Sequence, residues 1–246
     1  LEGDLSELLV NNIPSAELVR FGKNGNDATT AAVRLARHYT GKDNILFCGY
    51  HSWQDWYICK TSMNSGIPAD VGKYSHRFTY NNTKSLDDLV NKHNKKIACI
   101  IMEPISKEYP KKGFLNYVRK VATKNNIILI FDEVVTGFRY SLGGAQEYFN
   151  IKGDFVCFGK GMGNGLPITA ITGPEEFMKV FDDLWVSSTN NSESLSMAGT
   201  IATINEMKNE KTIEHCWKMG TKLFEGWNKI ADKYNIKSKM KGYPIR

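Results

Sequence analysis

The chain has 246 residues, 41% of them hydrophobic, and a formal net charge of +6 at pH 7. That length allows a sizeable core and fits one large α/β domain, or one domain with part of another. No apolar run approaches the roughly 18 residues that cross a bilayer, the first residues lack the order of a signal peptide, and the dispersed lysines form no nucleic-acid motif. We therefore expect a cytoplasmic protein without membrane or nucleic-acid partners.

The five cysteines are scattered along the chain and show no CxxC spacing. Most of them lie in strand-like runs, where cysteine behaves as a small apolar residue. This pattern favours reduced core thiols over disulfides or zinc ligands, so we expect no metal site. It also agrees with a cytoplasmic location.

Strand and helix patterns alternate along the chain. Leucines at positions 1, 5, 8 and 9 indicate a helix that is already under way at the first residue, and the next helix pattern covers residues 27–39. Further helices are predicted at 115–124, 195–208 and 213–234, and strands at 44–48, 97–102, 127–131, 154–158 and 168–172. The alternation predicts an α/β fold with a mostly parallel sheet and helices on both of its faces.

The two ends of the chain both resemble cut points. The first helix pattern has no beginning, and residues 238–246 start a strand or turn without completing it. We expect a large α/β domain over residues 1–212 that lacks its N-terminal part. Residues 213–246 would form a connecting helix and the start of a truncated C-terminal domain.

Two short segments carry the most specific chemical pattern. Asp132 follows the buried run 127–131, so it lies at a strand's carboxyl end, where open α/β sheets place their ligands. Lys160 follows the run 154–158 and stands between two glycines. Such a lysine suits Schiff-base chemistry with a carbonyl cofactor, and pyridoxal 5′-phosphate (PLP) is that cofactor. Taken singly, Asp132 could instead cap a turn, and Lys160 could be a solvated loop lysine.

A glycine-containing turn at residues 22–27 precedes the helix pattern 27–39. Free N–H groups at a helix start can bind a phosphate, although an ordinary turn capped by Asn26 or Asp27 explains the same residues. Tyr50 and His51 follow a strand and could cover a flat cofactor or simply pack over the core edge. The chain has no P-loop motif, and the glycines at 159–165 have the wrong spacing and context for a Rossmann site.

Several segments together, in this order, resemble the class III aminotransferases, a family of fold-type I PLP enzymes that includes glutamate-1-semialdehyde aminomutase. The most specific parts are FDEVVTGFR at 131–139 and the lysine at its correct distance from that stretch. The other matching segments are AELVRF at 16–21, the turn at 24–29, RLAR at 34–37, YTGKD at 39–43, GYH at 49–51, MEP at 102–104, and Thr189 ahead of LSMA at 195–198.

The resemblance implies how the cofactor ring is held. Lys160 would form the Schiff base and shuttle the proton between the substrate carbon and the cofactor carbon. Asp132 would pair with the pyridine nitrogen and keep it protonated. Val134 and Tyr50 would pack on the two ring faces, and His51 belongs to the same set of cofactor-binding residues.

The resemblance also implies a phosphate end and a homodimer. Gly25 and Asn26 would hold the phosphate, and Thr189 would reach the phosphate of a neighbouring subunit, because the site of this family lies at a dimer interface. Two of these segments depart from the family pattern. The turn reads Asn-Gly-Asn-Asp where Ser-Gly-Thr or Ser-Gly-Ser followed by Glu is usual, and residues 189–194 lack the usual Gly-Asn-Pro. Ser52 also replaces a glycine, while Glu103 and Arg139 match supporting positions.

The function implied by the resemblance is transfer of an amino group between an amine or amino acid donor and a carbonyl acceptor, both small molecules. An aminomutase, which moves the amino group within one molecule, is the nearest alternative. A non-catalytic module for dimerisation or partner binding is the alternative of another class. The presence of both Asp132 and Lys160 argues against that module, because it would need neither residue.

Overall fold

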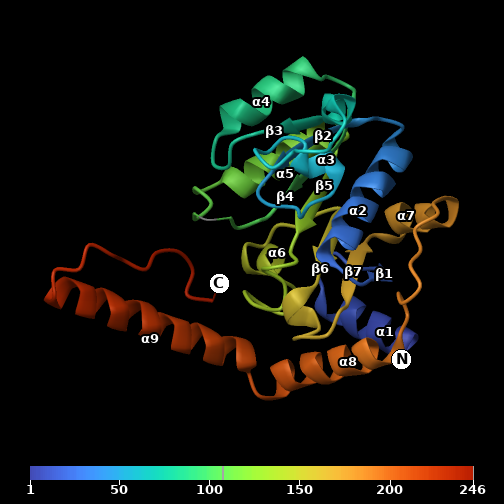
Figure 1. The fold of residues 1–246 in the computed structure, drawn as a ribbon. Coiled ribbons are helices and arrows are strands. Elements are labelled where there is room, and N and C mark those ends of the chain that lie inside the picture. Colours follow the sequence, from blue (N-terminus) through green and yellow to red (C-terminus); the bar gives the residue numbers. More distant parts are fainter. Residues whose placement is uncertain (107, 246) are drawn as a thin grey trace.

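The computed structural model describes residues 1–106 and 108–245, and a seven-stranded sheet lies at its centre (Figure 1). The strands follow the order β1-β7-β6-β5-β4-β2-β3, in which β7 is antiparallel to both β1 and β6 and the other neighbours are parallel. Their bounds are β1 Leu18–Gly22, β2 Asn44–Cys48, β3 Ser75–Arg77, β4 Ile97–Met102, β5 Ile128–Asp132, β6 Phe155–Phe158 and β7 Thr169–Gly173. The predicted α/β fold with a mostly parallel sheet is confirmed.

The five strands expected from the sequence are all present, and none of their ends moves by more than one residue. The sequence did not predict β1 and β3, which form the two edges of the sheet. Cys48, Cys99 and Cys157 are buried free thiols within strands, and burial raises the pKa of Cys99 to about 12. These three cysteines are core thiols, as their sequence setting indicates, whereas Cys59 and Cys216 are not buried.

Helices cover both faces of the sheet. Within β5, Ile128 and Ile130 pack in one core cluster with α2, while Leu129 and Phe131 pack in the other cluster with α1, α4, α5 and α8. This alternation follows from the two-residue period of a strand. The α-helices are α1 Glu2–Asn12, α2 Gly25–Thr40, α3 Asp55–Ile58, α4 Thr83–Lys92, α5 Phe114–Lys124, α6 Ala145–Tyr148, α7 Glu175–Met178, α8 Ser194–Asn209 and α9 Thr212–Lys233, and the 3-10 turns are η1 Ala69–Tyr74, η2 Lys160–Met162 and η3 Lys179–Asp183.

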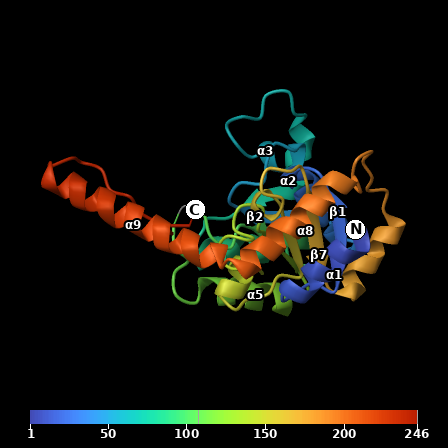
Figure 2. The same cartoon turned by 90° about the horizontal axis from the view of Figure 1, so that it is seen from below.

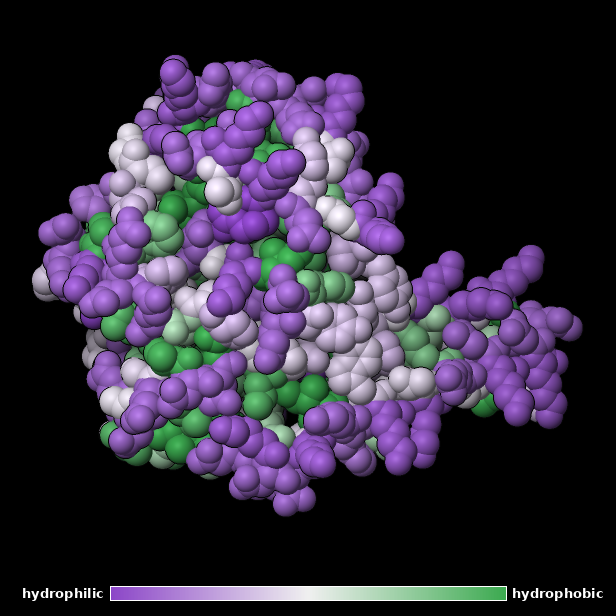
Figure 3. All heavy atoms as spheres, turned by 180° about the vertical axis from the view of Figure 1, so that it is seen from behind, coloured by the Kyte–Doolittle hydropathy of each residue, from purple (hydrophilic) through white to green (hydrophobic). Residues whose placement is uncertain are grey.

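The last two long helices differ in how they relate to the sheet. Helix α8 packs on α1 and on η2, whereas α9 continues from α8 and projects away from the sheet (Figures 1 and 2). Ala231 is the one buried residue of α9, and hydrophilic atoms dominate the side of the projection that Figure 3 shows. Within residues 1–106 and 108–245, no helix combines the length and apolar character required to cross a membrane.

Candidate active site

A cavity of about 420 Å³ opens at the carboxyl ends of the parallel strands. Its walls come from the start of α2, the loops after β2, β4 and β5, and the turn that contains Lys160. Of the residues predicted to bind the cofactor, it brings together Gly25, Asn26, Tyr50, His51, Asp132, Val134 and Lys160. Thr189 does not line this cavity; it lies in the exposed segment between η3 and α8.

Asp132 is the last residue of β5, and its carboxyl group is nearly buried. One oxygen, Oδ2, lies 2.7 Å from Nδ1 of His51, and the other accepts a hydrogen bond of 3.1 Å from the Val134 amide. The second ring nitrogen of His51, Nε2, lies 3.0 Å from the Cys48 carbonyl oxygen, which can only accept a hydrogen bond. An N–H group on Nε2 would donate to that carbonyl oxygen, and Nδ1 faces the Asp132 carboxyl group. The sequence placed His51 near the cofactor but did not reveal this contact.

Lys160 stands at the first position of η2, where the backbone turns sharply after β6. Its φ is +43°, in the left-handed region, and Gly159 before it is fully extended. Met162, at the end of the same turn, is completely buried and anchors it in the core. The lysine side chain is exposed toward the cavity that Asp132 also lines.

Val134 lies between the start of α2 and the Lys160 turn. A Cβ atom added at Gly25 would come 3.0 Å from Val134 Cγ1, and one added at Gly159 would come 3.4 Å from the same atom. Glycine at both positions leaves room for the valine side chain. Gly25, which the sequence predicts as a cofactor contact, therefore brings bare backbone to the cavity wall.

The start of α2 lies two residues earlier than the sequence indicates. The helix begins at Gly25 with Asn24 as its N-cap, so the expectation that Asn26 or Asp27 is the cap is wrong. Asp27 is instead the third helical residue, and its Oδ2 accepts hydrogen bonds from the backbone N–H groups of Asn24 (2.8 Å) and Lys23 (3.1 Å). Because Asp27 closes the turn from inside the helix, Gly25 and Asn26 present the first helical N–H groups, which have no partner within a helix.

The loop after β2 carries Tyr50 on the rim of the cavity, where 61% of its surface is exposed. Its amide donates a 3.1 Å hydrogen bond to Oε2 of Glu103. Gly49 has a φ of +101°, and a Cβ there would lie 2.8 Å from the same carboxylate oxygen, so this position requires glycine. Ser52 also has a positive φ, +82°, which explains why the family pattern has glycine at that position.

The sequence profile of the aminotransferase class-III family matches residues 2–243. The chain belongs to the class III aminotransferase family. The resemblance seen in its sequence is thereby confirmed.

This class III chain is similar to glutamate-1-semialdehyde 2,1-aminomutases. It is 40% identical over 252 residues to that of Methanobrevibacter smithii and 37% identical over 254 residues to that of Methanococcus maripaludis. These alignments cover 94% and 96% of the chain but only 59% of each relative. Among solved structures, a PLP internal aldimine form of the Sphingopyxis FumI protein is 27% identical, with a TM-score of 0.92 over 99% of this chain and 60% of that one. An omega-transaminase from Sphaerobacter thermophilus, at 24% identity and a TM-score of 0.90, has the same fold.

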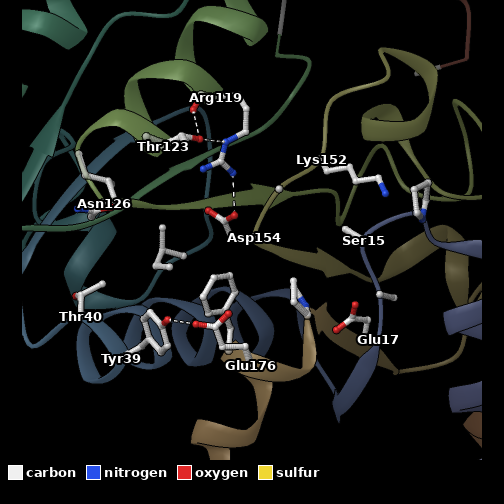
Figure 4. A pocket seen from close by; sticks show the side chains of 18 residues that line it. Ser15, Glu17, Tyr39, Thr40, Arg119, Thr123, Asn126, Lys152, Asp154 and Glu176 are labelled. Carbon is white, nitrogen blue, oxygen red and sulfur yellow. Dashed lines mark hydrogen bonds and ion pairs between the residues drawn. The ribbon is translucent and has the colours of Figure 1, made fainter.

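This class III chain has a second cavity, of about 760 Å³, at the opposite edge of the sheet, and Figure 4 shows it from close by. Two polar pairs join its walls: Arg119 with Asp154 at 2.9 Å, and the Tyr39 hydroxyl with Glu176 at 2.6 Å. The sequence predicts no site residue here. The pairs join α5 to the start of β6 and α2 to α7, so they stabilise the amino-end edge of the sheet.

Proposed function

We propose that this chain is the cofactor-binding part of a PLP-dependent aminotransferase that transfers an amino group between an amine or amino acid donor and a carbonyl acceptor. The observation that carries the proposal is the meeting of Lys160, Asp132 and the start of α2 in one cavity. These residues come from three separate parts of the chain. Together they offer an amine, a carboxyl group and free backbone N–H groups, which are the groups that PLP requires.

The residues around the cavity fit PLP. Gly25 and Asn26 would bind its phosphate through the first N–H groups of α2, where the helix dipole favours an anion. Asp132 would pair with the pyridine nitrogen, while His51 and the Val134 amide hold the carboxyl group in place. Val134 and Tyr50 would cover the two ring faces.

Lys160 has two roles in the proposal. Its Nζ is the covalent attachment point for PLP, and after release it moves the proton at the substrate carbon. PLP, when bound, supplies a ring that accepts the electrons left on that carbon. The left-handed backbone of Lys160 and its glycine neighbours position the amine at the sheet edge, facing the same cavity as Asp132.

An aminomutase is the second candidate, and the named aminomutase relatives at 37% and 40% identity favour it. The two activities differ in what they require. An aminomutase should isomerise glutamate 1-semialdehyde without an added amino donor, whereas a transaminase should turn over only when a donor and an acceptor are both supplied. Parallel assays of the full-length protein decide between them.

We also propose the arrangement of the rest of the protein. Residues 1–212 form the large cofactor domain, and residues 213–246 form a connecting helix and the start of a second domain. The projection of α9 away from the sheet supports this division. The protein would act as a homodimer in which Thr189 reaches the phosphate bound by the other subunit, consistent with the exposed position of Thr189 outside its own cavity.

Borohydride reduction of the full-length protein loaded with PLP tests the cofactor assignment. Reduction makes the lysine linkage permanent, and peptide mass mapping should locate the label on Lys160. The Lys160→Ala variant should carry no label, while Lys152→Ala, at the opposite edge of the sheet, should be labelled like the wild type. Absence of bound PLP, or a label on another lysine, would contradict the proposal.

A further inference from the structure

Two segments that depart from the family pattern contact each other in the fold. Lys23 immediately precedes the Asn-Gly-Asn-Asp turn, and Glu193 lies in the segment that lacks the usual Gly-Asn-Pro. Their side chains form an ion pair with 2.7 Å between Nζ and Oε1. The lysine side chain is only 13% exposed and the glutamate side chain 32% exposed, so the pair is shielded more than a typical surface ion pair.

Each partner is also bonded to the start of a helix. The Glu193 carboxylate is the N-cap of α8 and accepts hydrogen bonds from the amides of Leu195 (2.9 Å) and Ser196 (3.1 Å). The Lys23 amide donates to Asp27 in the first turn of α2, and its side chain lines the candidate active site. The hydrogen bond from Lys23 is the main reason why the pKa of Glu193 is lowered to about 2, so this carboxyl group is ionised at neutral pH.

Helix α8, which begins at this pair, also contacts the turn that contains Lys160. It packs on η2, and it approaches the following segment so closely that a Cβ at Gly199 would overlap Leu166 Cδ1. Leu166 lines the same cavity as Lys23. The ion pair thus connects the start of α2 to a helix that supports the catalytic lysine turn from the other side.

We propose that Lys23 and Glu193 are positioning residues that clamp the phosphate-binding turn of α2 to the start of α8 and thereby set the affinity for the PLP phosphate. This proposal rests on the proposed function. Neither side chain needs to touch PLP, because their effect is to fix the backbone N–H groups of Gly25 and Asn26.

If Lys23 bound the phosphate directly, the expected effect of Glu193→Gln on PLP binding would be the opposite. If Lys23 were itself a phosphate ligand, removing the charge of Glu193 would free it and tighten PLP binding. If the pair is a clamp, loss of either charge loosens the turn and weakens binding. Glu193→Gln separates the two cases, since glutamine can still accept the hydrogen bonds from the α8 amides.

The experiment measures the dissociation constants of PLP and of pyridoxal, which lacks the phosphate, for the full-length protein and its variants. Lys23→Met and Glu193→Gln should each weaken PLP binding about tenfold and leave pyridoxal binding unchanged. The double variant should be no weaker than either single variant, and Lys23→Arg should retain wild-type affinity. Lys84→Met and Asp88→Asn, which break an exposed ion pair in α4, serve as matched controls and should change neither constant.

Three results would overturn the clamp. They are unchanged PLP binding in both variants, tighter binding in Glu193→Gln, and an equal loss of PLP and pyridoxal binding, which would indicate general destabilisation. PLP binding by the wild-type protein shows whether a failure concerns the clamp alone or the proposed function as well. If borohydride labels Lys160 in the wild type and the variants bind PLP normally, only the clamp is wrong; if the wild type binds no PLP, the proposed function is wrong as well.

Discussion

Asp132 and Glu133 are neighbouring acids with different surroundings. Asp132 faces the candidate active site, whereas Glu133 is completely buried on the other side of the chain. The Glu133 carboxyl group accepts hydrogen bonds from the hydroxyl group of Thr136 and from the amides of Ala145 and Gln146, which tie the loop after β5 to the start of α6. These adjacent acids therefore have different roles. Asp132 lines the cavity, and Glu133 fixes the loop that follows β5.

Glu133 should make the stability of the protein depend on pH. Burial raises the pKa of its carboxyl group from 4.5 to about 7, against the opposing effect of its three hydrogen bonds. The folded state then holds a proton that the unfolded state releases, so the contribution of Glu133 is greatest below pH 4.5 and is lost as pH rises to about 7 and beyond. We expect the wild type to lose up to about 3 kcal/mol over this range relative to Glu133→Gln, as measured by urea unfolding. Parallel pH profiles for the two proteins would contradict this assignment.

At the scale of elements, the sequence predicts those strands that are buried on both faces. Every residue of the five central strands is buried, whereas β1 carries exposed residues, including Leu18, and β3 is only three residues long. Such edge strands leave no distinct pattern. The meeting of Asp132 and Lys160 was predictable, because the carboxyl ends of parallel neighbours share one edge. The contact of His51 with Asp132, 81 residues apart, and that of Lys23 with Glu193, 170 residues apart, depend on loop paths that no local pattern encodes.

Gly137 is a point where the loop after β5 packs directly on β6. A Cβ at this position would come 2.3 Å from the ring of Phe158 and 2.9 Å from the Glu133 carbonyl oxygen. The ring is completely buried and cannot turn aside, so Gly137→Ala should lower the free energy of unfolding by about 1–3 kcal/mol. Gly226→Ala is the control, since that site in α9 has open space and alanine favours a helix. Equal stability of the Gly137→Ala variant and the wild type would show that the loop and β6 are less tightly packed.

For the whole molecule, helix α9 and the segment before α8 are two of the regions where the described chain leaves large apolar side chains exposed. In α9, Leu223 is 60% and Ile230 is 51% exposed, and near the start of α8, Trp185 is 87% and Leu195 is 72% exposed. The second region borders Thr189, the residue proposed to reach the other subunit. A further domain or a second subunit could cover side chains in these two regions. They are consistent with the proposed second domain on α9 and the proposed dimer contact before α8.

Hybrid dimers provide a direct test of the shared site. Consider a dimer of one Lys160→Ala subunit and one Thr189→Ala subunit. Lys160 is then intact only in the second, Thr189→Ala, subunit. If Thr189 acts across the interface, that site receives its threonine from the first subunit, so it should bind PLP with wild-type affinity. The Thr189→Ala homodimer should bind about tenfold more weakly, as expected when one hydrogen bond to a charged phosphate is lost. A hybrid as weak as this homodimer would show that Thr189 acts within its own subunit, and Ser187→Ala homodimers, altered in the same exposed segment, should match the wild type.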